Sequence, residues 1–513
     1  MSRFLFRRID ALPPLAWCAE LRRGERDVVV THGRLVETTP DAFFEGVWDG
    51  PFADFAFLSA YTTMGSGGCR DGERACFVAP SHTYESLVTL SDGDRMWVSN
   101  SIAFILASAG DGPDLRYPSY HRDLLRLQRR GITGGDPAAL PTVRGRMLLL
   151  HAATDLFVDD RLVVTTGLRP RPPEPRDFAK YRSFLAESVA ALVRNAGDRA
   201  RTHRLRCAAT TSTGYDSPAT SVLAAEAGVR DTITFESGLA SGDSGRVIAE
   251  ALGLNVHAID PRRWCDLPGC PELDFLACSS GWAMLPMAGL AEAWNDSVIF
   301  LGSMGDELWR RDRQDVLPSL SRPRELQPAF AGLREFRLRA GIVFVHAPTI
   351  GAVHAEAIHR IARADEMTPW SLGNKYDRPV PRRIVETAGI PREAFGHTIH
   401  MTIDTQTPEI LRRLKRSSFA AFVDATADAV PRPLRRRLLF EWRWGPALTL
   451  VATGVAHALL GAGRRLGVRF VQRAGKVMII RIVRWQWHEP MPILYTFHWA
   501  TAELIRRYLD AAD

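Results

Sequence analysis

Short apolar runs that alternate with polar and turn residues dominate the first third of the chain. The stretches "DRMWVSNS" and "RGRMLLLHAATDLFVDDRLVVTT" are bounded by Gly, Asp and Asn and change polarity every few residues. This pattern is typical of strands. The glycine-rich stretch at 64–73, "MGSGGCRDGE", is predicted to be a flexible hairpin tip and not a dinucleotide-binding loop, because no strand–helix pair flanks it. Residues 1–166 are therefore expected to form a β-rich domain.

The pattern changes after a proline-rich, charged segment at 167–177, "GLRPRPPEPRD", which is typical of a linker. The next stretch, "FAKYRSFLAESVAALVRNAG", has the apolar spacing of a helix. Apolar strand patterns then alternate with helical ones; the strand patterns are "LRCAA", "DTITFES", "NVHAI" and "SVIF". Such alternation predicts a parallel sheet of β–α–β units, which binds ligands at the carboxyl ends of its strands. We therefore expect residues 178–513 to form an α/β domain.

Composition is that of a globular protein. The 513 residues are 46% hydrophobic and 24% charged, enough for a sizeable core without disulfides. The cysteines number seven, and the apolar run in "MSRFLFRRIDALPPLAW" is too short for a signal peptide, so a cytoplasmic protein is expected. Cys265, Cys270 and Cys278 lie close together but do not have the spacing of a common zinc site.

Positive charge is concentrated near the C-terminus. Residues 431–513 hold 14 Arg and Lys against 5 Asp and Glu, whereas the whole chain has a net charge of +7. The apolar stretch at 446–463, "PALTLVATGVAHALLGAG", is near the lower length limit for a membrane span, but His457 and its Thr and Gly residues favour a core helix or a helix at a basic surface. An anionic membrane surface or an acidic partner is the expected contact, which would make the protein peripherally membrane-associated. Nucleic acid is not expected, because no recognisable module accompanies the charge.

One polar turn joins a predicted strand to a predicted helix at 210–228, "TTSTGYDSPATSVLAAEAG". Pro218 suits the first helical turn, and Gly228 suits the helix end. Backbone N–H groups and the helix dipole at such a place favour an anion. An ordinary, well-capped β–α turn explains this stretch equally well.

A second loop, "LGSMGDELW" at 301–309, also follows a predicted strand and carries Asp306 and Glu307. The intervening β–α units can return it to the sheet edge that holds Asp216. Two carboxylates beside a phosphate-binding turn are what Mg²⁺–nucleotide chemistry needs, because hard oxygen ligands hold the metal. On its own, the acidic pair is better explained as a solvated helix start.

Together the two loops resemble the asparagine synthetase superfamily. "STGYDS" at 212–217 is similar to the S-G-G-x-D-S pyrophosphate loop, with Thr213 replacing its first Gly, and "GSMGDELW" is similar to the S-G-x-G-x-D-E motif. "SGDSGRVIAEALGL" resembles the second β–α unit of the family, "YTFHWATAELIRRY" its closing helix, and "NKYDRPVPRRIVETAGIPREAFG" the region before its catalytic lysine. The resemblance implies a parallel-sheet adenine-nucleotide α-hydrolase-like (PP-loop) synthetase domain at 178–513. Residues 1–166 resemble a degraded, α+β glutaminase domain.

Members of this superfamily convert a carboxylate to an acyl-adenylate, release pyrophosphate and let an amine attack. The resemblance implies ATP and Mg²⁺ as cofactors, with Mg²⁺ held by Asp216 and Asp306. The residues implied to hold ATP are Ser212, Gly214, Asp216, Ser217, Ser237 and Gly302. Asp306, Glu307 and Lys375 are the implied catalytic residues, Lys375 standing in for a family lysine that is not evident after "FG" at 395–396.

Two departures from the family define the expected reaction. Ser2 stands where glutamine-hydrolysing relatives have Cys, so glutamine is not expected as the nitrogen source. Ser303 stands where relatives have a Glu or Tyr base, and a serine hydroxyl is too weak a base; other candidates are Glu307, Asp312, His397 and His400. We expect a ligase that joins a small-molecule or peptide carboxylate to an amine, as β-lactam synthetases and the macrolactam-forming lasso peptide cyclases do. A non-catalytic scaffold and a nucleobase-modifying ATP pyrophosphatase are the alternatives.

Overall fold

The computed structural model describes most of the chain, and the statements below concern those residues alone. They are 3–117, 119–120, 123–124, 137–167, 169–236, 244–278, 281–311, 333–374, 376–396, 415–427, 432–487 and 491–512.

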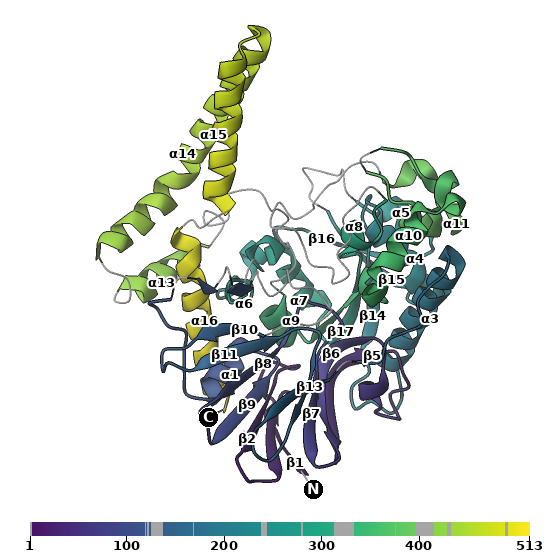
Figure 1. Ribbon diagram of the computed structural model, residues 1–513, viewed down its shortest axis with the longest axis vertical. Coiled ribbons are helices and arrows are strands. Elements are labelled where there is room, and N and C mark those ends of the chain that lie inside the picture. The colour runs from purple at the N-terminus through teal and green to yellow at the C-terminus, as the bar shows by residue number, and fades with distance from the viewer. Residues whose placement is uncertain are drawn as a thin grey trace.

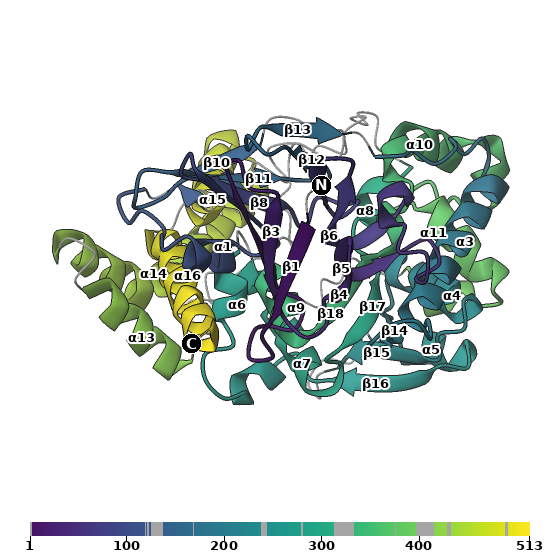
Figure 2. The ribbon, with the colours of Figure 1, turned by 90° about the horizontal axis from the view of Figure 1, so that it is seen from below.

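The N-terminal part consists of two β-sheets packed face to face (Figures 1 and 2). One has the strand order β1-β3-β2-β9-β8-β11-β10 and the other β13-β12-β7-β6-β5-β4. Trp17 of one sheet packs against Phe43 and Phe77 of the other, with ring centroids 5.0 and 6.1 Å apart. The sheets therefore share a core of inward-facing apolar side chains. The strands are β1 (Arg3–Arg8), β2 (Trp17–Arg22), β3 (Asp27–His32), β4 (Glu37–Thr39), β5 (Ala42–Trp48), β6 (Thr63–Asp71), β7 (Arg74–Val78), β8 (Leu87–Ser91), β9 (Arg95–Ser99), β10 (Ala138–Pro141), β11 (Met147–His151), β12 (Asp155–Val158) and β13 (Val164–Gly167).

The prediction of a hairpin tip at 64–73 is correct only for its last residues, because the turn between β6 and β7 lies at 72–73. Most of this stretch belongs to β6, which pairs with β5 and β7 and is buried over its first half. A Cβ on Gly65 would lie 1.9 Å from the carbonyl oxygen of Glu45, and one on Gly67 2.1 Å from that of Phe43. The glycines are needed because the two strands approach closely, not because the chain turns.

The second part contains the predicted parallel sheet, and its strand order is β16-β15-β14-β17-β18. All neighbouring strands in it run parallel, so the expected β–α–β architecture is confirmed. β14 lies at the centre beside the fully buried β17, and helices connect successive strands. The elements are α3 (Phe178–Ala196), β14 (Arg206–Thr210), α4 (Asp216–Glu226), β15 (Asp231–Phe235), α5 (Arg246–Ala251), β16 (Asn255–Ile259), α6 (Leu273–Leu276), α7 (Leu290–Ala293), β17 (Ser297–Leu301), α8 (Gly305–Leu308), α9 (Arg334–Ala340), β18 (Ile342–His346), α10 (Ala355–Arg363) and α11 (Pro379–Thr387).

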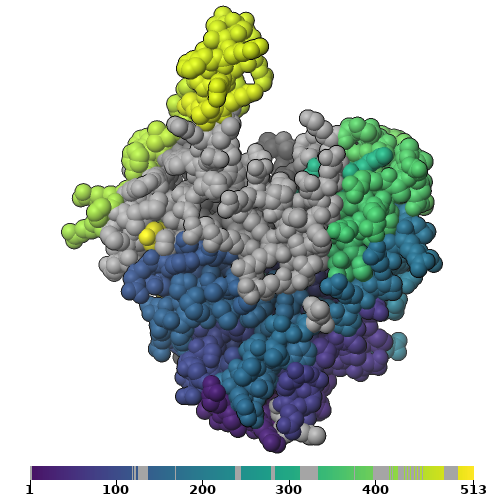
Figure 3. All heavy atoms as spheres, in the orientation of Figure 1, coloured from purple at the N-terminus to yellow at the C-terminus, as the bar shows by residue number. Residues whose placement is uncertain are grey.

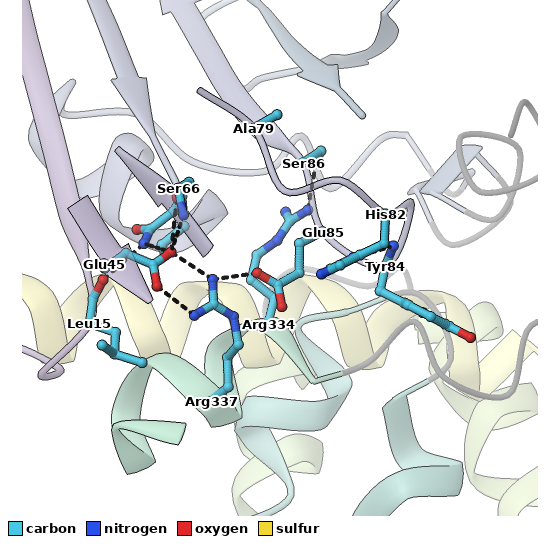
Figure 4. Close-up of polar contacts among 12 residues, drawn as sticks. Leu15, Glu45, Ser66, Ala79, His82, Tyr84, Glu85, Ser86, Arg334 and Arg337 are labelled. Carbon is cyan, nitrogen blue, oxygen red and sulfur yellow. Dashed lines mark hydrogen bonds and ion pairs between the residues drawn. The ribbon is translucent and has the colours of Figure 1, made fainter. Parts of the chain in front are cut away.

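A buried ion cluster joins the two parts (Figure 4). Arg337 of α9 donates two hydrogen bonds of 2.8 and 2.9 Å to the carboxylate of Glu45 on β5 and also pairs with Glu85. Ser66 donates to Glu45 from its backbone N–H and its hydroxyl. Burial raises the pKa of Glu45, and Arg337 offsets this only in part. The guanidinium fork therefore compensates two carboxylates that water does not reach.

The chain ends in four helices: α13 (Arg416–Ala427), α14 (Arg432–Arg465), α15 (Arg469–Trp487) and α16 (Met491–Ala512). Helix α16 packs on α1 (Ile102–Ser108) of the N-terminal part, where the rings of Phe104 and Tyr508 stack 4.6 Å apart. Helices α14 and α15 form a hairpin whose tip projects from the rest of the molecule, while α14 also contacts α16 (Figures 1 and 3). Within the described residues, none of the helices combines the length and the apolar character needed to cross a membrane.

Candidate functional site

The two loops singled out in the sequence follow adjacent strands of the parallel sheet. β14 and β17 pair in register, with Ala208 opposite Ile299, and the strand order reverses between them. The chain runs from β14 outward to β15 and β16 on one side, and from β17 to β18 on the other. Such a switch point leaves a crevice at the carboxyl edge of the sheet, where open α/β sheets bind ligands. The structure therefore brings the loops of Asp216 and Asp306 to one place.

Two glycines let the second loop lie directly against the start of α4. A Cβ on Gly302 would lie 2.4 Å from the backbone nitrogen of Ser217, and one on Gly305 would lie 2.3 Å from Cγ of Asp216. Real Cβ atoms do not approach other atoms this closely, so any larger residue would push the loops apart. Glycine at 302 and 305 thus fixes the distance between the two acidic motifs.

The first loop presents polar groups at the N-terminus of α4. The hydroxyls of Ser212 and Ser217 lie 2.7 Å apart, and the N–H of Gly214 donates to Oγ of Ser212. Tyr215 occupies the N-cap position and makes no side-chain cap hydrogen bond. The positive end of an eleven-residue helix therefore meets two hydroxyls at the sheet edge, an arrangement that suits a phosphate group.

Asp216 carries a buried charge that its surroundings only partly compensate. Its pKa is raised to about 6: burial is the largest cause, Arg378 lowers the pKa, and the nearby Asp306 raises it. One carboxylate oxygen, Oδ2, pairs with Arg378. The other, Oδ1, is buried and has no hydrogen-bond partner among the described residues. A cation at Oδ1 would remove this cost.

The residues present fit Mg²⁺. This ion usually takes one or two carboxylates from the protein and completes its shell with water and substrate phosphates. Asp216 and Asp306 provide the two carboxylates beside a turn suited to phosphate. No group of three His, Cys, Asp or Glu side chains that could hold a metal occurs in the described part of the chain. A cation held by these two acids would therefore rely on its substrate for the remaining ligands.

A segment distant in sequence, 376–396, holds the first loop in place. Arg382 of α11 donates to the hydroxyl of Tyr215 at 2.7 Å, and the N–H of Gly396 donates to the carbonyl of Thr213 at 2.7 Å. The rings of Tyr215 and Tyr376 lie 4.8 Å apart. These contacts, together with the ion pair between Arg378 and Asp216, hold the N-terminus of α4 in place.

Buried side chains and a contact with α3 fix the second loop. The indole of Trp309 is fully buried and donates to the hydroxyl of Tyr181 on α3 at 2.9 Å. Met304 has a φ of +72°, a backbone conformation that costs a non-glycine residue free energy and is held here by its packing. Ser303 and Glu307 are buried. This rigid support positions Asp306 at the sheet edge.

The sequence predicts part of this site, and the structure adds a residue that the sequence did not indicate. Ser212, Gly214, Asp216, Ser217, Gly302, Asp306 and Glu307 all lie on the two loops. Ser237, Lys375, Asp312, His397 and His400 lie outside the described residues. Arg378, which pairs with Asp216, was missed, although it lies in the segment "NKYDRPVPRR" that was assigned to the neighbourhood of a catalytic cation.

No protein-family model matches the chain, and no curated protein is significantly similar to it. The two motifs and the geometry of the switch point are therefore what indicate the function of this chain.

Proposed function

We propose that this protein is an ATP-dependent ligase with a PP-loop-type fold, which adenylates a carboxylate, releases pyrophosphate and couples the acyl group to an amine without glutamine. The observation that supports this most is the convergence of Asp216 and Asp306 at the switch point, with one buried oxygen of Asp216 unsatisfied and Arg378 beside the other. Two acids, one cation and a helix N-terminus are suited to binding a metal–polyphosphate.

In this proposal the chain binds and orients its substrates and needs no nucleophilic side chain. Ser212, Ser217 and the N-terminal amides of α4 bind the pyrophosphate part of ATP. Asp216 and Asp306 would hold Mg²⁺, which would supply positive charge to the phosphates when bound. A carboxylate oxygen attacks the α-phosphorus as the bond to pyrophosphate breaks; an amine then attacks the acyl carbon and AMP leaves. Preorganised amides and cations stabilise the charge that builds on each leaving group.

The test is ATP–pyrophosphate exchange with a panel of carboxylic acids that includes peptides. Exchange that needs both Mg²⁺ and one class of acid is expected, followed by release of AMP and pyrophosphate in equal amounts when the amine is present. Tight ATP binding without exchange for any acid would contradict the ligase. Absence of both ATP binding and exchange would indicate a scaffold that has kept the fold, and AMP formation only with a nucleobase substrate would indicate a nucleobase-modifying enzyme.

Mg²⁺ is expected to stabilise the protein more at neutral than at acidic pH. Without the cation, the pKa of Asp216 is about 6, above the ordinary 3.8. The folded state therefore binds more protons than the unfolded state between these values, and the free energy of unfolding falls as pH rises through this window, by up to about 1.4 kcal/mol per unit. Mg²⁺ binds the ionised carboxylate and should restore this loss. Thermal unfolding with and without Mg²⁺, at about pH 7.5 and about pH 5, measures the effect.

Asp216→Asn is the control for that experiment, because it removes the titrating group and should make the Mg²⁺ response small at both pH values. An equal response of the wild-type protein at the two pH values would show that the cation binds elsewhere.

Arg378 is expected to contribute to the reaction as a fixed positive charge beside the polyphosphate. Arg378→Gln should lower the rate of pyrophosphate exchange by about a hundredfold, and Arg378→Lys by about tenfold, because lysine keeps the charge and loses the planar donor pair. In Arg378→Gln, the half-maximal rate should move to higher pH, since Asp216 loses the cation that favours its ionised form. Unchanged exchange in both variants would assign Arg378 a structural role.

A further inference from the structure

The hairpin of α14 and α15 is built almost without negative charge. Its residues, 432–487, include twelve Arg and Lys and one acidic residue, Glu441. This gives the hairpin a surplus of eleven positive charges in a chain whose net charge is only +7. The rest of the protein is therefore slightly acidic, and the basic character belongs to one projecting element.

Small residues hold the two helices together. A Cβ on Gly475 would lie 2.8 Å from the side chain of Leu460, and one on Gly463 would lie 2.7 Å from the backbone nitrogen of Gln472. Gly467, with a φ of +70°, ends α14, and the N–H of Val468 donates back to the carbonyl of Gly463. This is a glycine-based helix end that reverses the chain. The hairpin is thus closely packed and does not rely on the protein body for its internal contacts.

Large apolar side chains on the outside of this hairpin are left in solvent. Four of them follow each other at helical spacing and form one stripe along α14: Phe440, Leu448, Val451 and Val455. At the tip, the side chains of Leu466 and Phe470 are 74% and 80% exposed. The tip also carries exposed arginines, Arg464, Arg465, Arg469 and Arg473. Exposed apolar surface of this extent needs a partner.

We propose that this hairpin inserts its tip and apolar stripe into the headgroup region of an anionic membrane. Its chemistry suits a lipid surface, because aliphatic and aromatic side chains reach the acyl boundary while the flanking arginines pair with phosphate groups. A nucleic acid would use the arginines and leave Leu466 and Phe470 in water. A second copy of the chain would bring two strongly positive hairpins together.

The position of the hairpin indicates which side of the protein would face the membrane. In Figure 1 the hairpin projects from the upper side of the molecule, and α8, which carries Asp306, lies on the same side. A membrane bound by the hairpin would therefore lie on the side of the candidate site. The membrane contact does not depend on the ligase activity, which is measured separately.

Vesicle flotation of the full chain tests the proposal. The probes are vesicles of phosphatidylcholine alone and vesicles with about one third phosphatidylserine, at about 0.05 M and 0.5 M NaCl. The wild-type protein should float with the anionic vesicles at low salt, and the bound fraction should fall at high salt. Leu466→Ser/Phe470→Ser, which keeps every charge, should lower the partition coefficient about tenfold or more, since apolar contact is lost. Arg464→Gln/Arg465→Gln should also weaken binding.

Val143→Ser/Val163→Ser is the matched control, because these valines are 55% and 53% exposed in the N-terminal part, in the turn after β10 and just before β13, and should not affect flotation. Circular dichroism and the unfolding midpoint should be the same for all variants. Failure of the wild-type protein to bind anionic vesicles at low salt would overturn the proposal. Undiminished binding of Leu466→Ser/Phe470→Ser to the vesicles would also overturn it. So would a wild-type dimer that becomes a monomer in this variant, or displacement of the protein from vesicles by a short DNA duplex at equal phosphate concentration.

Discussion

Asp216→Asn and Asp306→Asn are each expected to lower the rate of pyrophosphate release by about a thousandfold, because each removes one of two carboxylates that would hold the cation against a polyanion. Both changes keep the size and shape of the side chain. Asp216 has one buried oxygen without a partner, and Gly305 packs against its Cγ, so the loop is built around this carboxylate. Exchange of isotopically labelled pyrophosphate into ATP measures the effect.

The matched control lies in the same loop. Ser303→Ala removes a buried hydroxyl two residues from Gly305 and should keep most adenylation and most amide formation, because serine is too weak a base to accept the proton of the amine. If Asp216→Asn and Asp306→Asn are folded and exchange pyrophosphate at the wild-type rate, the site lies elsewhere. If Ser303→Ala loses only amide formation, Ser303 works in the second half-reaction.

Arg337→Ala is expected to lower the free energy of unfolding by about 3–5 kcal/mol, because it leaves two buried carboxylates without their cation. Arg337 is 1% exposed, and its guanidinium makes both hydrogen bonds to Glu45 as well as the ion pair with Glu85 (Figure 4). The cluster lies between the N-terminal sheets and α9, so its loss should also weaken the contact between the two parts. The midpoint of urea denaturation gives the change.

Two further measurements separate this charge effect from simple loss of packing. Replacing all three groups, in Glu45→Gln/Glu85→Gln/Arg337→Met, should recover a large part of the lost stability, because no buried charge is left unpaired. The pKa of Glu45 is already raised by burial and should rise further in Arg337→Ala. A carboxyl whose folded pKa exceeds its unfolded pKa gains stability as pH falls, so the deficit of Arg337→Ala should shrink at acidic pH. This account would be contradicted if the loss of unfolding free energy in Arg337→Ala were the same at all pH values and were not reduced by replacing Glu45 and Glu85.

Local pattern predicted the elements of the parallel sheet well. The strand patterns at 205–209, 231–237, 255–259 and 297–300 agree with β14, β15, β16 and β17 to within a residue or two. Alternation of strands and helices is a property of neighbouring residues, and parallel strands put their carboxyl ends at one edge. The juxtaposition of Asp216 and Asp306 follows from these two facts, so it could be predicted from the sequence.

The local sequence pattern was misleading in the glycine-rich stretch at 64–73, because glycine occurs both in turns and where two strands approach closely. A turn and a close approach of two strands both require glycine, and the stretch at 64–73 does not distinguish them until its partner strand is known. Only the pairing of β5 with β6 shows that Gly65 and Gly67 make room for the backbone of the neighbouring strand.

The sequence by itself determined the class of the fold, the two loops at its switch point and the basic C-terminal segment, because each depends on residues that are near one another in the chain. Tertiary structure alone decided which cation faces Asp216 and what neutralises Glu45. Arg378 is 162 residues from Asp216, and Arg337 is 292 residues from Glu45. At such separations many arginines are available to either acid, and only the packing of α11 and α9 selects the pair whose desolvated charges compensate each other.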